Sequence, residues 1–559
     1  MAISVFPRGT RIPKINPKFL EPDTPQIAIN ADPESGNLSP LKGLLQAAAL
    51  TKAGELRSIF KLGSAWLTWT NVVDVVKAQI PGSDDRFFYT GDGVPKQSNM
   101  TMATSGAPST YPTSSYDLGV PAPTSILTTT FAGTVDASLT PKVVSYVYTY
   151  VTVWGEESAP STESPVAEVE GGRYIYLTNF INPANSRISH IRVYRIEVGT
   201  SGSAEYQLVK VRPSSLDGTP VYDIPIATIA STSTRIYDAN HGTTPTGLSE
   251  DLGEVIPSED WAVPPTNLAN LTQFMNGIMV GSSDTDVCIS EPMIPYAWPV
   301  KYRQTLDYPV VGLGVFNSTI IALTTAYPYR LQGSDPARVS LTRLEYKQGC
   351  VSKRGIVTTP AGVIYPSPDG LFMVDDVAVR NLTASLFTAE QWAALGPQNL
   401  IGFLYDDAYY GFFQGTGRGL VITIDAVPVL QEFDLGVAIY GGHVDPVTNT
   451  LVLLGKPSTY YIYNWGEGAS LPYTWTTMKF STSPTNWSVA QIKGPFDAGS
   501  ITFTPILGGT RYPAITVSND GFFWLPSGIL YRDLEVEVQG LSQIDQILIA
   551  HHPEELSNV

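Results

Sequence analysis

The sequence predicts an all-β protein, built as a β-propeller with an inserted immunoglobulin- or fibronectin-like β-sandwich and an extended N-terminal arm. The 559-residue chain holds 48 Gly and 44 Pro, which make it turn often. Its 29 Tyr, 20 Phe and 10 Trp favour strands. Hairpin turns also recur at a nearly constant spacing in the second half of the chain, which is typical of propeller blades.

Residues 1–50 form the predicted arm. Seven prolines lie between Pro7 and Pro40, and each one removes a backbone donor and favours an extended predecessor. We therefore expect the arm to run over a surface, either of this chain or of a neighbouring subunit. At its end, Leu44–Ala53 lies between two glycines and is expected to form a short helix.

Residues 51–130 are predicted to hold the first part of the propeller and a long loop. The stretch RSIFKLGSAWLTWT places Gly63-Ser64 at a hairpin turn, and DDRFFYTGDG reads as a further strand. Residues 97–130 are rich in Ser, Thr, Pro and Gly, which is typical of a loop or linker.

Residues 131–250 are predicted to be the inserted sandwich. SYVYTYVTVWGEES alternates tyrosines with valines, and RISHIRVYRIEVG, YQLVKV and TRIYDA supply further strands. Short strands separated by turn-rich stretches are typical of a β-sandwich.

Residues 251–470 are predicted to be the main β-propeller, and residues 471–559 a C-terminal β region that completes or flanks it. Five strand–turn–strand units in the main propeller repeat about every 41 to 45 residues, with turns at Asn276-Gly277, Asn317-Ser318, Ala361-Gly362, Asp406-Asp407 and Thr448-Asn449. One helix is predicted among them, opened by Thr388 with Gln391 three residues later and stopped by Gly396-Pro397.

The charge and the cysteine content narrow the range of functions. With 34 basic and 51 acidic residues the net charge is −17, which argues against tight DNA binding but not against DNA passing by. Cys288 and Cys350 are too few for a disulfide framework or a Cys-based zinc site. The N-terminus lacks an apolar signal segment, and no apolar run approaches the roughly 18 residues of a membrane span. We expect synthesis in a cytoplasm and no stable membrane insertion.

No catalytic, cofactor-binding or metal-binding residues are predicted. The histidines match no catalytic or metal motif; they are His190, His241, His443, His551 and His552. Asp284 and Asp286 lack the rest of a calcium loop. Ser367–Gly370 and Ser518–Trp524 are similar to the Asp box of propeller sialidases but lack one residue of it, and we interpret both as Asp-Gly hairpin turns.

Three stretches resemble a known family. They are RIPKINPKFLEPDTPQIAINADPESGNLSPLKG at Arg11–Gly43, the region from Val287–Pro299 through Thr325–Val357, and RDLEVEVQGLSQIDQILIAHHPEEL at Arg532–Leu556. Together they are similar to the tail nozzle proteins, also called tail tubular protein B, of short-tailed bacteriophages. The resemblance covers most of the chain outside the insert.

The resemblance implies a structural virion protein, not an enzyme, with no cofactor. It implies a homo-oligomeric ring of about six copies at the distal end of a phage tail, which gates and conducts double-stranded DNA during genome ejection. The implied partners are an adjacent tail adaptor or tube protein and tail fibres. Two alternatives stay open: another tail hub, plug or fibre adaptor, and a carbohydrate-active propeller enzyme.

Overall fold

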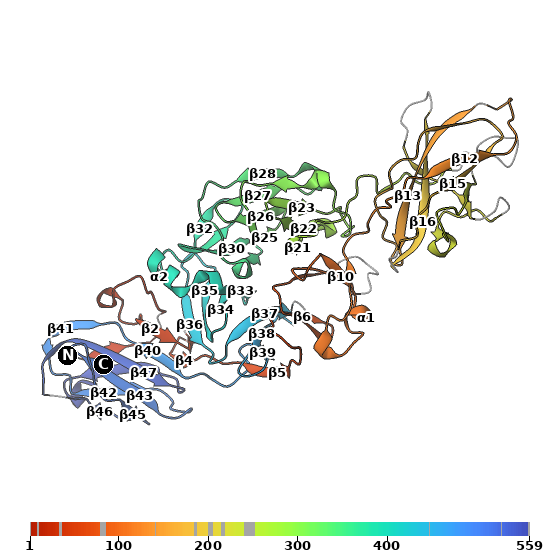
Figure 1. Cartoon of the computed structure of the whole chain (residues 1–559). Coiled ribbons are helices and arrows are strands. Elements are labelled where there is room, and N and C mark those ends of the chain that lie inside the picture. The colour runs from red at the N-terminus through yellow and green to blue at the C-terminus, as the bar shows by residue number, and fades with distance from the viewer. Residues whose placement is uncertain are drawn as a thin grey trace.

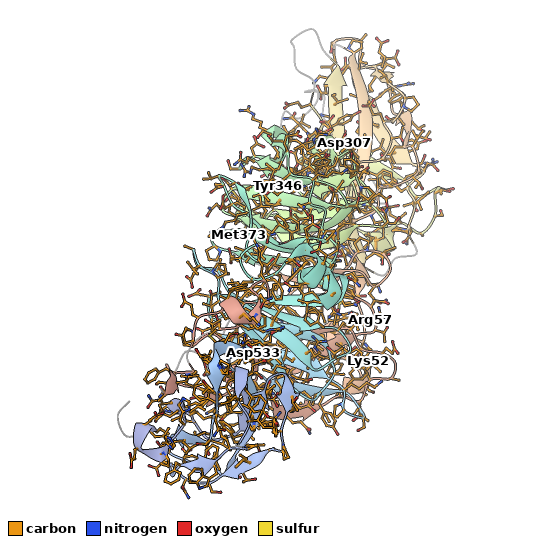
Figure 2. All side chains as sticks on the ribbon, turned by 90° about the vertical axis from the view of Figure 1, so that its left-hand side faces the viewer. Lys52, Arg57, Asp307, Tyr346, Met373 and Asp533 are labelled. Atoms are coloured by element: carbon orange, nitrogen blue, oxygen red, sulfur yellow. The ribbon has the colours of Figure 1, made fainter. Side chains whose placement is uncertain are left out.

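The computed structural model describes all residues except 1, 8–9, 33–35, 79–84, 140, 184–186, 199–204, 214–217, 240–251, 446–447, 527 and 557–559. Its regular structure is nearly all β, arranged in many small antiparallel sheets (Figure 1). A view turned by 90° shows an elongated molecule, with the C-terminal unit at one end, beyond Asp533, and the inserted unit at the other (Figure 2). The ring of sheets described next lies between them.

Six four-stranded sheets and one hairpin follow one another in a ring. Their first strands touch in the order β6, β37, β33, β29, β25, β21, β8, and the hairpin packs on β8–β9 through a shared apolar cluster around Trp69 and Tyr89. The first three members are the hairpin β6 (Ser58–Leu62) and β7 (Ala65–Trp69); β8 (Asp74–Lys77), β9 (Phe87–Thr90), β10 (Lys96–Ser98) and β11 (Tyr116–Asp117); and β21 (Ala269–Gln273), β22 (Met279–Ser283), β23 (Asp286–Ile289) and β24 (Gln304–Thr305).

The remaining four sheets follow one another along the chain, except that the last takes its fourth strand, β5, from the N-terminal arm. They are β25 (Val310–Phe316), β26 (Thr319–Thr324), β27 (Pro328–Gln332) and β28 (Ser340–Arg343); β29 (Val357–Thr359), β30 (Gly362–Ser367), β31 (Gly370–Val374) and β32 (Val379–Asn381); β33 (Leu400–Tyr405), β34 (Ala408–Phe413), β35 (Arg418–Thr423) and β36 (Leu430–Asp434); and β37 (Ile439–Asp445), β38 (Thr450–Gly455), β39 (Tyr461–Asn464) and β5 (Leu45–Ala49).

The predicted repeat of hairpin turns is confirmed. Each predicted turn lies at or next to the connection between the first and second strands of one sheet, as Asn317-Ser318 does between β25 and β26. Asn317 and Asp406 adopt positive φ angles of 48° there, a conformation that Asn and Asp tolerate in tight turns. The hairpin at Gly63-Ser64 is confirmed as well, because Leu62 pairs with Ala65.

The predicted helix at Leu44–Ala53 is wrong. Leu45–Ala49 forms strand β5, which pairs with β39 and completes the last sheet of the ring. The run LQAAA has good helix propensity, but the open edge of β39 offers its backbone a full set of hydrogen-bond partners. Packing against a distant segment therefore overrides the local preference.

The insert consists of two sheets packed face to face. Tyr146, Tyr148 and Tyr150 share a core with Ile175 and Leu177 of the opposite sheet. One sheet holds β12 (Thr128–Ala132), β15 (Tyr174–Thr178), β20 (Ile236–Asp238) and β18 (Val211–Pro213); the other holds β14 (Ala167–Val169), β13 (Lys142–Thr152), β16 (Ile188–Val198), β17 (Gln207–Leu208) and β19 (Ile224–Pro225).

Residues 97–130 are not one long loop. They hold the end of β10, helix α1 (Met100–Ala103), strand β11 and the start of β12. Ala103 is fully buried under the β6–β7 hairpin. Polar side chains bind the backbone of these short elements: Asn99 caps α1, Thr104 donates to the carbonyl of Met100 and Ser98 to that of Ser114. The polar residues that suggested a loop therefore stabilise ordered turns.

The C-terminal unit also has two sheets with a common core, which includes Trp475, Trp487, Phe503 and Ile547. One sheet is β1 (Ile3–Val5), β48 (Gln546–Ala550), β42 (Val489–Lys493) and β46 (Phe523–Trp524), with helix α3 (Pro553–Leu556) beside it; the other contains β40 (Tyr473–Thr476), β47 (Tyr531–Gly540), β43 (Ile501–Leu507), β44 (Thr510–Arg511), β41 (Phe480–Thr485) and β45 (Ile515–Val517).

The arm is extended, but the surface under it is that of its own chain. Strand β1 pairs with β48, so the two chain ends lie side by side (Figure 1). Strand β2 (Ile27–Ile29) inserts between β36 of the ring and β40 of the C-terminal unit, which makes one continuous sheet of eleven strands. The arm also forms the small hairpin of β3 (Ala31–Asp32) and β4 (Ser39–Pro40).

The predicted helix is confirmed as α2 (Ala389–Leu395). Thr388 Oγ1 accepts from the Gln391 backbone at 3.2 Å, Gln391 Oε1 accepts from the Thr388 backbone at 2.9 Å, and Gly396 ends the helix with φ 78°. Short 3-10 turns complete the regular structure: η1 (Pro17–Phe19), η2 (Pro108–Thr110), η3 (Ile226–Thr228), η4 (Met275–Gly277), η5 (Val300–Tyr302), η6 (Pro336–Arg338), η7 (Lys353–Gly355) and η8 (Pro397–Asn399).

Candidate functional site at the axis of the sheet ring

The connection into β29 reaches distant members of the ring through its side chains. Arg354, in η7, donates through Nη2 to the carbonyl oxygens of Arg57 at 2.8 Å and Tyr440 at 2.7 Å. Those two carbonyls belong to the start of the β6 hairpin and to β37, which are other members of the ring than the β29 sheet that follows η7. One side chain thus ties three members of the ring together.

Lys353 reaches a further sheet from the same turn. Its Nζ lies 2.7 Å from Asp74 Oδ2 of β8, and Thr90 donates to the same carboxylate oxygen at 3.2 Å. A cavity of about 150 Å³ adjoins this pair, and its wall includes Asn270 and Thr358. The turn therefore joins members of the ring on both sides of the β29 sheet through cationic groups held by anionic and carbonyl oxygens.

Burial makes the Arg354 guanidinium easier to deprotonate. Loss of water around it, and then repulsion from Arg57, lower its pKa from 12.5 to about 10. The group stays charged at neutral pH, and its hydrogen bonds to backbone oxygens are of the stronger, charge-assisted kind.

A second cluster closes the seam between β6 and β37. Lys61 Nζ contacts Asp445 Oδ2 at 2.8 Å, and the ring of His443 packs against that of Phe60 at 5.1 Å. Burial lowers the pKa of His443 from 6.5 to about 4; the nearby Asp445 opposes this shift and Lys61 adds to it. The imidazole is therefore neutral at physiological pH.

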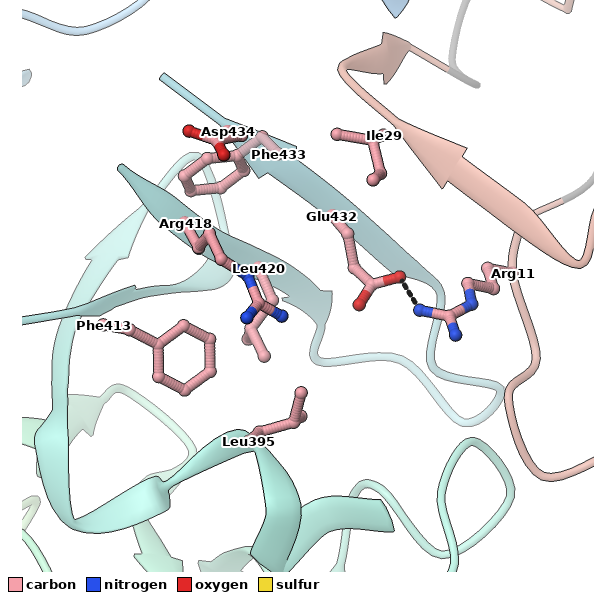
Figure 3. A pocket seen from close by; sticks show the side chains of 10 residues that line it. Arg11, Ile29, Leu395, Phe413, Arg418, Leu420, Glu432, Phe433 and Asp434 are labelled. Carbon is pink, nitrogen blue, oxygen red and sulfur yellow. Dashed lines mark hydrogen bonds and ion pairs between the residues drawn. The ribbon is translucent and has the colours of Figure 1, made fainter. Parts of the chain in front are cut away.

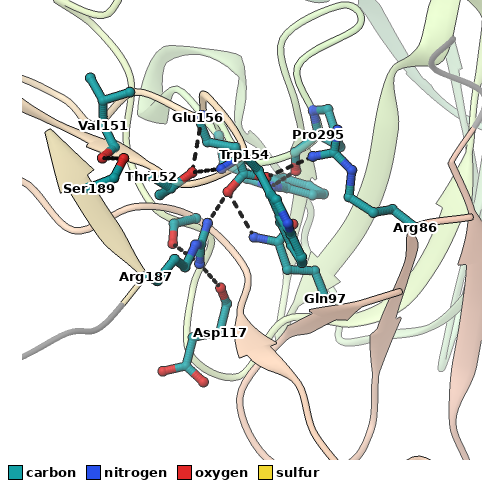
Figure 4. Close-up of polar contacts among 12 residues, drawn as sticks. Arg86, Gln97, Asp117, Val151, Thr152, Trp154, Glu156, Arg187, Ser189 and Pro295 are labelled. Carbon is teal, nitrogen blue, oxygen red and sulfur yellow. Dashed lines mark hydrogen bonds and ion pairs between the residues drawn. The ribbon is translucent and has the colours of Figure 1, made fainter. Parts of the chain in front are cut away.

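The insert meets the ring at a buried ion pair (Figure 4). Glu156 pairs with Arg187, the residue just before β16, and both side chains are only 2 % exposed. Gln97 of β10 donates to the same carboxylate at 3.1 Å, and Arg86 lies 3.5 Å from its other oxygen. Arg187 also donates to the carbonyl of Asp117 at 2.6 Å. These contacts fix the direction in which the insert leaves the ring.

The histidines singled out in the sequence do not come together. His190 contacts Ser189 in the insert, His443 lies in the ring, and His551 stacks on Trp487 with ring centroids 5.2 Å apart. His241 lies outside the described residues. In the part of the chain that the structure describes, no group of three or more His, Cys, Asp or Glu side chains could hold a metal ion.

The other candidates have local structural roles. Asp284 accepts from Asn267 at 3.1 Å and Asp286 from Thr305 at 2.7 Å. Ser367–Gly370 is a hairpin turn, as predicted, because its end residues pair. Ser518–Trp524 is not a hairpin: it links β45 and β46, which pair with different strands, and Asn519 closes its bend onto Gly521.

Both cysteines are free and buried. Burial raises the pKa of the Cys288 thiol to about 11 and that of Cys350 to about 12. Neither thiol is therefore poised for nucleophilic chemistry.

Sequence reasoning missed the residues that hold the axis and the insert. Lys353, Arg354, Glu156 and Arg187 match no motif, since their partners lie tens to hundreds of residues away. The sequence held one weak signal for these residues. Charged residues follow or precede a glycine between apolar strand segments, in KRG at Lys353–Gly355 and in GEES at Gly155–Ser158.

Comparisons with known proteins give no family assignment. No family model and no curated protein matches the chain. Among solved structures, the chain is similar to the Neurospora crassa Pan2 WD40 domain, with 9 % identity, a TM-score of 0.25, and coverage of 53 % of this chain and 86 % of that one. It is also similar to BBS1N from its complex with ARL6DN, with 10 % identity, a TM-score of 0.29, and coverage of 77 % and 99 %. At these scores the account of the fold rests on the sheet topology itself.

Within the described residues, no helix is both long and apolar enough to cross a membrane.

Proposed function

We propose that this chain is a structural subunit of a bacteriophage tail, and that several copies form the ring-shaped distal nozzle that gates and conducts DNA during genome ejection. In this proposal the ring of sheets is a β-propeller, the insert is an immunoglobulin-like sandwich, and the protein works in the virion without enzymatic activity or a cofactor. The proposed partners are further copies of the chain, about six in all, an adjacent tail adaptor or tube protein, and tail fibres.

The observation that carries the proposal is the continuous β structure from the ring into the C-terminal unit. Strand β2 joins the two through an eleven-stranded sheet, and Asn30 donates to the carbonyls of Asp434 on one side and Pro472 on the other, each at 3.2 Å. A rigid wedge of this kind suits a subunit that must withstand pressure and keep its shape around a channel.

The contacts of η7 agree with this interpretation. Lys353 and Arg354 join the β29 sheet to β8, β6 and β37, and in this proposal the inside of one subunit is structural and is not the path of the DNA. A conduit must then lie between copies, on the axis of an assembly. The net charge of −17 favours a wall that repels phosphate and lets the strand slide.

The test is electron microscopy and light scattering of the purified protein and of the assembled particle. We expect a closed ring of about six copies with an axial channel. A chain that remains monomeric in the presence of its tail neighbours, or one that cleaves a polysaccharide, contradicts the proposal.

A further inference from the structure

The N-terminal arm is held on the body through charge. Arg11 pairs with Glu432 of β36 (Figure 3), Lys18 lies 3.6 Å from Asp533, and Gln26 donates to Glu535 at 2.5 Å. The first two of these contacts set a basic side chain of the arm against an acidic one of the body. The arm thus lies in a groove between β36 of the sheet ring and β40 of the C-terminal unit, where Glu432, Asp533 and Glu535 face it and Lys479 pairs with the last two.

The rest of the attachment is made by strand edges. Strand β1 adds to the edge of β48, and β2 fills the gap between β36 and β40. Such pairing uses backbone groups, and its geometry is the same whichever copy of the chain supplies the added strand.

The arm is buried at some points and exposed at others. Val5 and Leu38 lie in the core of the C-terminal unit, whereas six large apolar side chains of residues 1–50 are exposed: Phe6 at 43 %, Ile15 at 39 %, Phe19 at 80 %, Ile27 at 38 %, Ile29 at 37 % and Leu45 at 46 %. A cavity of about 110 Å³ lies beneath it, with Arg11 and Ile29 of the arm on one side and Phe413 and Leu395 of the body on the other (Figure 3).

We propose that the arm is exchanged between neighbouring copies, so that the arm of one subunit fills the same groove of the next. The inference rests on the proposed assembly of about six copies, and it names the contact that links one copy to the next. Exchange of an identical element preserves every hydrogen bond and ion pair and costs little free energy. It also keeps the edges of β36, β40 and β48 covered, edges that would otherwise invite aggregation.

Assembly of several copies favours exchange. When neighbouring subunits are held together, each arm meets the groove of the next subunit at a high effective concentration. Each exchanged arm then adds a strand to the interface, and a closed ring of exchanged arms has no free end.

The experiment is a disulfide trap in the full-length protein. Ile29 and Thr474 are direct partners across β2 and β40, a spacing that suits a disulfide. The matched control pairs Thr474 with Gln539, its partner on β47, where both residues belong to the body. The native cysteines are buried and stay out of the reaction.

Purified rings of I29C/T474C are oxidised and run on a denaturing gel without reductant. Exchange predicts a ladder of covalent multimers up to the copy number of the ring, while T474C/Q539C gives covalent monomers only. Rings of I29C/T474C that yield only monomers overturn the exchange and leave the proposed function intact. A protein that forms no ring overturns both, and microscopy of the same sample before oxidation separates the two failures.

Discussion

Removal of the buried cation at the junction of the insert should destabilise the protein strongly. Arg187 and Glu156 are each only 2 % exposed, and Arg187→Met keeps the length of the side chain while it removes the charge. The carboxylate then stays buried with Gln97 at 3.1 Å and Arg86 at 3.5 Å.

Breaking a buried pair by removing one partner costs roughly 3–5 kcal/mol. Because Arg86 and Gln97 partly compensate Glu156, we expect a loss near the lower end, about 3 kcal/mol. In the double variant Glu156→Gln/Arg187→Met neither member of the buried pair carries a charge, and only the more exposed Arg86 loses an acidic partner, so its loss should be smaller than that of Arg187→Met alone by about 1–2 kcal/mol.

The measurement is urea unfolding followed by tryptophan fluorescence. Trp154 reports on this junction, since the Arg86 guanidinium lies over its ring at 5.2 Å. The free energies are compared at unchanged m-value, so that only stability differs. If the free energy of unfolding of Arg187→Met lies within about 0.5 kcal/mol of that of the parent chain, or if the double variant loses as much as Arg187→Met or more, the pair does not hold the insert as we argue.

Three further predictions concern the ring and its helix. The pKa of His443 is 6.5 in the unfolded chain and about 4 in the folded one, so the unfolded chain binds the extra proton between these pH values. The free energy of unfolding should therefore fall by up to about 3 kcal/mol as the pH drops from 6.5 to 4. His443→Gln should flatten that part of the pH profile of thermal unfolding, and an unchanged slope refutes the assignment. Thr388→Ala should cost about 1 kcal/mol by loss of the cap of α2, whereas Thr388→Ser should cost little, as thermal unfolding will show. Cys288 and Cys350 should not react with a thiol reagent until the protein unfolds, because burial raises both thiol pKa values; rapid labelling of the native protein contradicts this.

Local features of the fold were predictable from sequence. Asn317-Ser318 and Asp406-Asp407 predict tight turns, because few residues other than Asn, Asp and Gly tolerate positive φ. Each of these turns does connect the first two strands of a sheet in the ring. The capping box at Thr388 likewise acts within four residues and formed as predicted.

Features that depend on distant partners were not predictable. Leu45–Ala49 resembles a helix until the edge of β39 is present, more than 400 residues later. The axial role of Arg354 depends on the carbonyls of Arg57 and Tyr440, and no local pattern encodes a backbone acceptor. The extended arm was visible in its prolines, but its seat between β36 and β40 was not.

The pairing of the first strand with the last sets a timetable for biosynthesis. Ile3 lies opposite Ile549, so β1 has no partner until almost the whole chain has left the ribosome. At about 5–20 residues per second, that wait lasts on the order of half a minute to two minutes. Throughout it the backbone groups of Ile3–Val5 lack their strand partner, and β2 waits in the same way for β40.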